Sequence, residues 1–468
     1  MRLSLKWIIP AALAVAVLLT AALAVLLRPS SALFAASAVE PAVISPNADG
    51  SDDVTMVSYS LSRAASVTIL FEHTDGRRFV FREDEARTAG DYSVLFSGVV
   101  DGYLNEGETV QGEVLRRLMP DGDYTWQMIA TEASGAQETA TGILTLTDGE
   151  PALPEIYEFT IFPEVFTPNQ DGITDRTAIN VGLSKPSELQ VYLEREGMQP
   201  IFVPERLEVN DSNASMLRHL FDYEGGVDLG ADPPPDGEYT VVALAQDAVG
   251  QRVQRTGTLT LLNGGKPFAQ IVPQPSGATV IFEAQPYDEA YYTTAETRGA
   301  LIGQPESPAG LSTNAITMNV GDMLVFQLTV ENYSDIPIRT AGSPPGTVYD
   351  WTQRAATLGE FDQSGAWRVG IDCDTAASDY PWRWRLGTDE QILTVDDPDT
   401  GDTFYYLPAG ARVVVWGAIR MTEVEARNPQ NCWAGLIHED VGISQLNASV
   451  GPRRIFLEDL SETAEDTN

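Results

Sequence analysis

The sequence predicts an all-β protein made of consecutive β-sandwich domains behind a single N-terminal transmembrane helix. Three observations lead to this prediction: a long motif that occurs twice, short runs of alternating hydrophobic residues between turn residues, and an uncharged apolar stretch from Trp7 to Leu27. A chain of 468 residues has room for about three domains of ordinary size. Its hydrophobic content of 43% is sufficient for folded cores.

The apolar stretch is long enough to cross the core of a bilayer as a helix. Arg2 and Lys6 precede it, and this charge bias keeps the N-terminus cytoplasmic and sends the bulk of the chain outside. We therefore expect a membrane anchor over residues 1–28 and a short tether over residues 29–40. The alternative is a signal peptide cleaved at Ala36-Ser37-Ala38, which would leave a secreted protein.

The duplicated motif is the strongest indication of domain organisation. Ser45-Pro46-Asn47-Ala48-Asp49-Gly50-Ser51-Asp52-Asp53 returns 122 positions later as Thr167-Pro168-Asn169-Gln170-Asp171-Gly172-Ile173-Thr174-Asp175. A second shared element follows, Pro120-Asp121-Gly122-Asp123-Tyr124 in one copy and Pro235-Asp236-Gly237-Glu238-Tyr239 in the other, now 115 positions apart. A head and a tail repeated in the same order indicate a duplicated domain whose first copy is seven residues longer between them.

Within each copy, hydrophobic residues alternate with polar ones, as in Val57, Tyr59 and Leu61 of the first. Period-two runs bounded by turn residues are typical of half-buried antiparallel strands, and Pro-Asp-Gly is turn chemistry. We expect a small β-sandwich in residues 41–148 and another in residues 160–262. Residues 149–159 should form the linker between them, stiffened by two prolines.

The remainder of the chain stays β-like without the repeat. We expect a third, sandwich-like domain over residues 268–457 and an acidic tail over residues 458–468. Cys373 and Cys432, the two cysteines of the chain, lie in this domain. On the outer side of a membrane they could form one disulfide, and the alternative is two separate buried thiols.

The repeated elements resemble a known kind of module. The S/T-P-N-x-D-G-x-x-D opening, a Leu-Ser pair between two strands, and the later P-D-G-x-Y and A-x-D/E-A-x-G elements resemble the Ig-like module of flagellar hook-capping proteins and related repeats of bacterial surface proteins. The resemblance covers the two repeats and implies an Ig-like or fibronectin-like sandwich. It implies no flagellar role, because the exported hook-capping protein lacks an N-terminal membrane anchor.

The repeated loops offer candidate metal ligands. Calcium prefers several oxygen ligands around a turn that glycine permits. Both loops lack the distal bidentate Glu of an EF-hand, so the alternative is an Asx-turn in which the carboxylates accept backbone N–H bonds. No other cofactor is expected. The candidate calcium ligands are Asn47, Asp49, Asp53, Asn169, Asp171 and Asp175.

Aromatic residues concentrate in the last third of the chain, which holds six of the eight tryptophans. In the run that ends at Arg385, strand alternation places Trp382 and Trp384 on one face and Arg383 and Arg385 on the other. These four residues could form a ligand or partner surface. The alternative is that the tryptophans fill a core. In so acidic a chain, the arginine pair indicates an internal or intermolecular salt bridge.

Charge and motifs narrow the function. A net charge of −38 repels phosphate backbones and excludes nucleic acid as a partner. The sequence has no Gly-x-Ser-x-Gly elbow, phosphate-binding glycine loop or His-Glu-x-x-His helix, so we expect no enzymatic activity. We expect a membrane-anchored extracellular protein with a structural, adhesive or complex-assembly role, whose partners are envelope or surface proteins or a surface polysaccharide. The alternative is a carbohydrate-binding surface protein that uses the C-terminal tryptophans.

Overall fold

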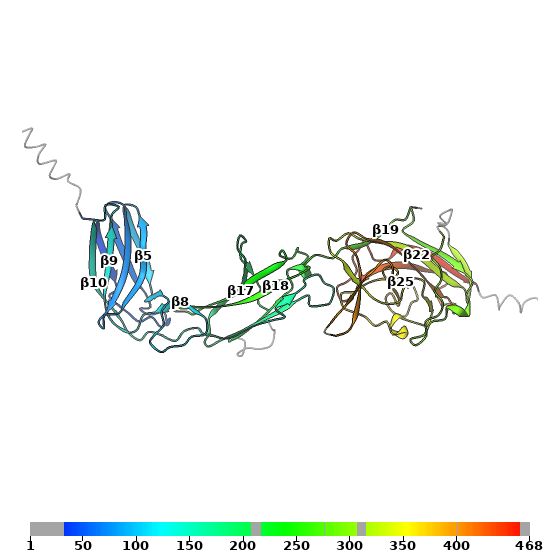
Figure 1. Ribbon diagram of the computed structural model, residues 1–468, viewed down its shortest axis with the longest axis horizontal. Helices are drawn as coiled ribbons and strands as arrows, with labels where there is room; N and C mark the ends of the chain where they lie inside the picture. Colours follow the sequence, from blue (N-terminus) through cyan, green and yellow to red (C-terminus); the bar gives the residue numbers. More distant parts are fainter. Residues whose placement is uncertain (1–31, 207–216, 276, 307–314, 399, 459–468) are drawn as a thin grey trace, which may run out of the picture. The chain divides into compact units, whose positions relative to one another are not determined.

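The computed structural model describes residues 32–206, 217–275, 277–306, 315–398 and 400–458 (Figure 1). Over these ranges the chain consists of β-strands and three single-turn 3-10 helices, which confirms the all-β prediction. The predicted anchor over Trp7–Leu27 lies outside the described residues. Within them, no helix is long and apolar enough to span a membrane. The 3-10 helices are η1 (Val227–Leu229), η2 (Glu289–Tyr291) and η3 (Ala355–Leu358).

The first repeat is a sandwich of two sheets, with strand orders β1-β3-β6 and β2-β10-β9-β4-β5. Its alternating residues face one shared core; every second side chain is buried in β3, and in β4 as far as Phe71. Figure 1 labels β5, β9 and β10 in this domain; β9 pairs with β10, and β4 lies between β9 and β5. The strands are β1 (Phe34–Glu40), β2 (Val43–Ile44), β3 (Thr55–Leu61), β4 (Ala65–His73), β5 (Arg78–Arg87), β6 (Gly90–Phe96), β9 (Gly122–Thr131) and β10 (Gln137–Leu146).

Part of the expected tether belongs to this sandwich. Residues 34–40 form β1, which pairs antiparallel with β3 and sets Val39 opposite Val57. Phe34 and Val39 are buried in the core of the repeat. The strand was not predicted from the sequence, because the residues between Phe34 and Val39 are small and only these two side chains are buried apolar residues.

The second repeat has the same plan, with one sheet of order β11-β13-β16 and a second that contains β15-β14-β17-β18, on which β12 also pairs. The chain divides into two compact units, and the division crosses this repeat: residues 180–220 and 241–257 belong to the first unit, and residues 161–179, 221–240 and 258–468 to the second. The strands are β11 (Ile156–Phe162), β12 (Val165–Phe166), β13 (Thr177–Leu183), β14 (Glu188–Glu194), β15 (Ile201–Phe202), β16 (Arg218–Tyr223), β17 (Gly237–Gln246) and β18 (Arg252–Leu261).

The Pro-Asp-Gly-x-Tyr element performs the same task in both copies. The hydroxyl of Tyr124 donates to the carbonyl of Pro120 at 2.5 Å, and that of Tyr239 to the carbonyl of Pro235 at 2.7 Å. Such a tyrosine pins the turn that precedes its own strand, as in the tyrosine corner of Ig-like sandwiches. The duplication seen in the sequence is therefore a duplication of hydrogen bonds.

A hairpin lies between the repeated head and tail of the first copy, where that copy is longer. It consists of β7 (Val99–Asp101) and β8 (Glu113–Leu118), and β8 pairs antiparallel with β18, with Val114 opposite Val253. A strand of the first repeat thus extends a sheet of the second. This pairing was not predicted from the sequence.

The expected linker is held by one buried side chain. The amide nitrogen of Gln251 donates to the carbonyl oxygens of Glu150 at 3.2 Å and Ala152 at 2.9 Å. Its amide oxygen accepts from the backbone N–H of Leu118 at 3.2 Å, at the end of β8. Since Gln251 is fully buried, these bonds form without competition from water. The junction is hydrogen-bonded to both repeats within the first unit.

The C-terminal domain is a larger sandwich. One sheet has the order β19-β22-β29-β24 with β20 on β22, and the other has the order β21-β31-β30-β25-β23-β28-β27 with β26 on β25. Its core lies between these sheets. The strands are β19 (Ala269–Val272), β20 (Val280–Gln285), β21 (Ile316–Asn319), β22 (Met323–Asn332), β23 (Ile338–Thr340), β24 (Val348–Asp350), β25 (Trp367–Cys373), β26 (Trp382–Arg385), β27 (Leu393–Asp396), β28 (Thr403–Leu407), β29 (Arg412–Arg420), β30 (Gln430–His438) and β31 (Val450–Glu458).

Candidate functional sites

The first repeated loop is a network of backbone hydrogen bonds to carboxylate and amide oxygens. Asp53 accepts the N–H groups of Asn47 at 3.1 Å and Ala48 at 2.7 Å on Oδ1, and that of Gly50 at 2.8 Å on Oδ2. Desolvation acts to raise the pKa of Asp53, but the backbone N–H groups outweigh it and hold that pKa below its usual value. The N–H of Asp49 donates to Oδ1 of Asn47 at 3.0 Å.

The second loop makes equivalent bonds. The N–H of Asp171 donates to Oδ1 of Asn169 at 3.0 Å, and that of Gly172 to Oδ2 of Asp175 at 2.7 Å. N–H groups directed at these oxygens support the Asx-turn interpretation, because each occupies an acceptor that a cation would need. In the described part of the chain, no group of three His, Cys, Asp or Glu residues is placed to hold a metal ion. Calcium binding stays a prediction for experiment.

The two loops differ in their surroundings. Asp49 is exposed, whereas its counterpart Asp171 is only 7% exposed. Within the second unit, the hydroxyl of Tyr406 donates to Oδ2 of Asp171 at 3.0 Å, and Nε2 of His438 lies 2.8 Å from the carbonyl oxygen of Gln170. The second loop therefore lies against the C-terminal domain.

Two glycines permit this contact. Gly172 and Gly365 both have positive φ angles, of 81° and 77°. A Cβ atom on Gly172 would lie 1.9 Å from the carbonyl oxygen of Ser364, and one on Gly365 would lie 2.1 Å from the carbonyl carbon of Asp171. Any side chain at either position would force the two backbones apart.

The contact contains titratable groups with shifted pKa values. Burial, and then the negative charge of Asp171, raise the pKa of Asp175 to about 6. Burial also raises the pKa of Asp171 itself. It lowers the pKa of His438 to about 4, although the backbone hydrogen bonds to Gln170 and Gly365 act in the opposite direction. His438 is therefore neutral at pH 7 and donates from Nε2 to the carbonyl of Gln170.

The predicted tryptophan surface is wrong. Trp382 is 1% exposed and Trp384 is 0% exposed, and both belong to the core of the C-terminal domain. Trp384 packs edge-on against Phe326 and donates from Nε1 to the carbonyl oxygen of Thr347 at 3.0 Å. Alternation placed the two rings on one face correctly, but it could not show that the second sheet covers that face.

The arginines of the same strand form ion pairs, as predicted. Nη1 of Arg383 lies 2.8 Å from Oε1 of Glu439, a carboxylate that is itself buried, and Arg383 also pairs with Asp362. Arg385 pairs with Asp389. These pairs are internal to the C-terminal domain, so neither arginine is available as a partner surface.

The two cysteines lie directly opposite each other on β25 and β30. Their Cα atoms are 4.0 Å apart, and the sulfur atoms form a disulfide between Cys373 and Cys432. Both residues are buried and belong to the tryptophan-rich core. The bridge joins two strands that are 59 positions apart in the chain.

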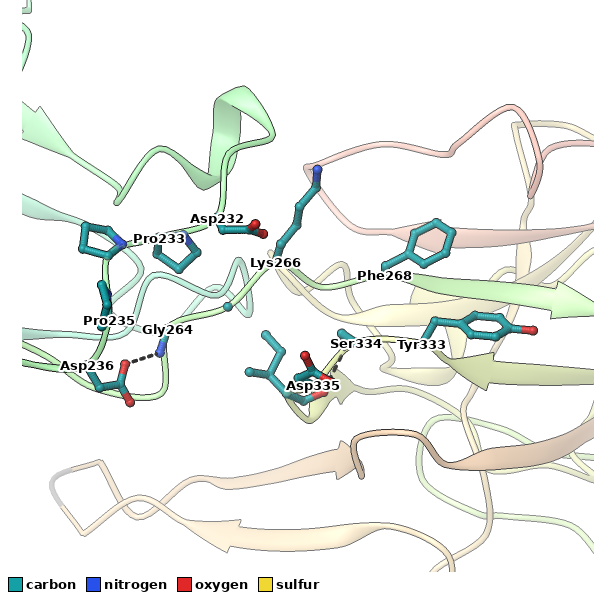
Figure 2. A pocket seen from close by; sticks show the side chains of 13 residues that line it. Asp232, Pro233, Pro235, Asp236, Gly264, Lys266, Phe268, Tyr333, Ser334 and Asp335 are labelled. Carbon is teal, nitrogen blue, oxygen red and sulfur yellow. Dashed lines mark hydrogen bonds between the residues drawn. The ribbon is translucent and has the colours of Figure 1, made fainter.

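A pocket of about 630 Å³ lies in the second unit, and sequence reasoning missed it (Figure 2). Phe268 and Tyr333 form one wall, with ring centroids 6.0 Å apart. The opposite wall contains Pro233 and Asp236. Each aromatic residue stands one position outside a strand end, so only the pairing of β19 with β22 brings the rings together.

No family model matches this chain, and no curated protein matches it. It is similar to a solved calcium-stabilised adhesin with which an Antarctic bacterium binds ice, at 13% identity over 89% of this chain and 72% of that one, with a TM-score of 0.19. A tetra-tandem repeat from the extending region of a large adhesion protein matches at 11% identity over 91% and 92% of the two chains, with a TM-score of 0.16. A segment of two fibronectin type III domains from chicken tenascin matches at 13% identity over 48% and 98%, with a TM-score of 0.15. TM-scores this low carry no argument about function, and none of the three is a flagellar hook-capping protein, so that resemblance stays a prediction.

Proposed function

We propose that this protein is a membrane-anchored, extracytoplasmic structural component that assembles with or adheres to other surface components through its β-sandwich modules. The observation that carries the proposal is the pairing of β8 with β18, which joins the first repeat to the second by a shared sheet. A flexible linker would make few such contacts, whereas a strand pair and the buried Gln251 join β8 of the first repeat to β18 within the first unit. A sheet shared between two modules suits a structural component built from repeated domains.

The chemistry of the described residues supports a non-catalytic role. The buried acidic groups of the second loop accept hydrogen bonds from backbone N–H groups and from Tyr406, and Glu439 pairs with Arg383. Asp171, Asp175 and Glu439, whose pKa values burial raises, thus each have a structural partner. General acid–base catalysis needs such a group to face a substrate instead.

The proposed location follows from the uncharged stretch Trp7–Leu27 and its preceding positive charges. Protease added to intact cells should remove the sandwiches and leave a small N-terminal fragment in the membrane fraction. A soluble mature form that begins near Val39 would contradict the anchor.

The assembly role is tested by crosslinking on intact cells, followed by purification of the full chain from solubilised membranes. We expect a partner in constant proportion to the chain, and less of it for Gln251→Leu, which removes the hydrogen bonds that hold the junction. Gln137→Leu, an exposed position on β10, is the matched control. Recovery of the chain without a partner would contradict the proposal.

A further inference from the structure

We propose that the pocket in Figure 2 is a binding site for a neutral saccharide, with Phe268 and Tyr333 as its stacking platform. The volume of about 630 Å³ is within the range of roughly 300–1,000 Å³ that small-molecule sites occupy. This inference is independent of the membrane anchor and of the assembly role. The site contains none of the tryptophans that are buried in the core of the C-terminal domain.

The platform is held in place by the backbone. The N–H of Tyr333 donates to the carbonyl oxygen of Phe268 at 2.8 Å, which continues the β19–β22 ladder by one pair. Cross-strand neighbours place their side chains on the same face of the sheet, so the two rings lie side by side, as Figure 2 shows. Phe268 and Tyr333 are 45% and 50% exposed, a large open area for two aromatic rings. Aromatic faces bind the C–H faces of sugar rings by dispersion and by removing apolar area from water.

A buried asparagine fixes the turn that follows Tyr333. The amide nitrogen of Asn332 donates to the carbonyl oxygens of Ile336 at 2.9 Å and Pro408 at 3.0 Å, and its oxygen accepts the N–H of Ser334 at 3.0 Å. Asn332 is fully buried, so these bonds are stable. Tyr333 and Asp335 are therefore positioned before any ligand arrives, which lowers the entropy cost of binding.

The opposite wall is equally well fixed. Asp236 accepts the N–H groups of Asn263 at 2.7 Å and Gly264 at 3.0 Å, and the second of these bonds is drawn in Figure 2. Nζ of Lys266 donates to the carbonyl oxygen of Gly230 at 2.7 Å. Three consecutive prolines, Pro233 to Pro235, stiffen the segment between Gly230 and Asp236.

Two carboxylates remain available for a ligand. Asp232 and Asp335 line the pocket, and among the described residues neither has a hydrogen-bond or ion-pair partner for its side chain. A carboxylate accepts hydrogen bonds from two adjacent hydroxyl groups, which is the donor pattern that a sugar presents.

Charge and geometry select the ligand class. Asp232, Asp236 and Asp335 outnumber Lys266, so the pocket repels uronic acids, sulfated sugars and phosphates. Recognition of a cation by aromatic rings uses a cage that surrounds it. Here the ring planes meet at 39° and the rings lie next to each other, which forms a platform. A neutral saccharide fits both observations.

The test uses the full chain in a detergent without a sugar headgroup, because a maltoside or glucoside would compete for the site. The probes are immobilised neutral hexasaccharides of glucose, mannose, xylose and N-acetylglucosamine, with hyaluronan and a hexalysine peptide as charged comparisons. We expect saturable binding of at least one neutral hexasaccharide and weakening by about tenfold or more, or about 1.4 kcal/mol, for Tyr333→Ala and Phe268→Ala. Tyr333→Phe should retain binding, because the ring remains.

Tyr292→Ala is the matched control, since Tyr292 is 49% exposed in the same domain and lies outside this pocket. It should bind as the unaltered chain does. The proposal is overturned if no neutral hexasaccharide binds, or if Tyr333→Ala and Tyr292→Ala have equal effects. It is also overturned if hexalysine alone binds and Asp335→Asn abolishes that binding.

Discussion

The hydroxyl of Tyr406 donates a hydrogen bond to Oδ2 of Asp171, which lies 3.0 Å away in space and 235 positions earlier in the chain. Asp49 occupies the equivalent position of the first repeat and is exposed. One nine-residue motif is therefore a surface turn in one copy and a domain contact in the other. The two copies act as controls for each other in the experiments that follow.

The close approach of Gly365 to the second loop predicts a position-specific effect of alanine. Gly365→Ala and Gly410→Ala both place a Cβ at a positive φ, which costs about 1–2 kcal/mol. Only the Cβ at residue 365 meets Asp171, whereas nothing lies within 4 Å of one at residue 410. We expect faster amide hydrogen exchange over residues 167–175 in Gly365→Ala alone, as measured by mass spectrometry. Equal exchange in the two variants would contradict the contact.

The raised pKa of Asp175 predicts that the two loops respond to pH in opposite directions. The folded state binds this proton more tightly than the unfolded chain, so its contribution to stability falls as pH rises from about 4 to about 6. The lowered pKa of Asp53 has the reverse sign, and its contribution is lost as pH falls below the usual Asp range. After correction for intrinsic rates, hydrogen exchange in His438→Gln, where His438 no longer titrates, should show the second loop more protected at pH 4 than at pH 7. The first loop should lose protection as the pH falls below 3.8. Asp175→Asn and Asp53→Asn should each abolish the response of their own loop.

Over this pH range, the pKa shift of His438 changes stability in the opposite direction to that of Asp175. The effect of His438 is therefore measured separately. A histidine buried in its neutral form has a lowered pKa, here about 4, so folding is destabilised as pH falls from 6.5 toward 4. His438→Gln keeps a donor for the carbonyl of Gln170 but carries no titrating ring. We expect this variant not to be destabilised as pH falls from 6.5 toward 4. The response of Asp175 to pH is therefore measured in this variant. In the unaltered chain, NMR titration should show that the imidazole of His438 stays neutral down to about pH 4. Titration of His438 near pH 6.5 would contradict this prediction.

The Asx-turn interpretation predicts indifference to calcium. Because backbone N–H groups occupy the oxygens of Asp53, chelation should leave the Tm of the full chain unchanged. Differential scanning calorimetry with excess calcium and with chelator is the measurement. A calcium-dependent rise in Tm that Asp49→Ala abolishes would establish the calcium site instead.

The disulfide predicts a large stability difference in the C-terminal domain. Closing a loop of 59 positions stabilises a domain by roughly 4 kcal/mol in the chain-entropy model. The double variant Cys373→Ala, Cys432→Ala should unfold at lower denaturant, as followed by tryptophan fluorescence. Free thiols at both positions after rapid alkylation of the native protein would refute the bridge.

The local features of this protein could be predicted from its amino-acid sequence alone. The alternation of Val57, Tyr59 and Leu61 predicted β3, and the repeated Pro-Asp-Gly-x-Tyr element predicted the turns that Tyr124 and Tyr239 pin. These features depend on neighbours within a few positions, and a side-chain period of two can be recognised in a single sequence. The duplication was visible for the same reason.

Which faces of the strands are covered, and which distant residues come into contact, depends on the tertiary structure. Trp382 and Trp384 lie on one face as predicted, yet a second sheet buries that face. Asp171 and Tyr406 meet across 235 positions, and Phe268 and Tyr333 meet because β19 pairs with β22. Burial and long-range pairing depend on the packing of the whole chain. The side chains of a strand alternate in the same way whether its faces are covered by another sheet or open to solvent. That is why the two copies of one motif, at Asp49 and Asp171, have opposite environments.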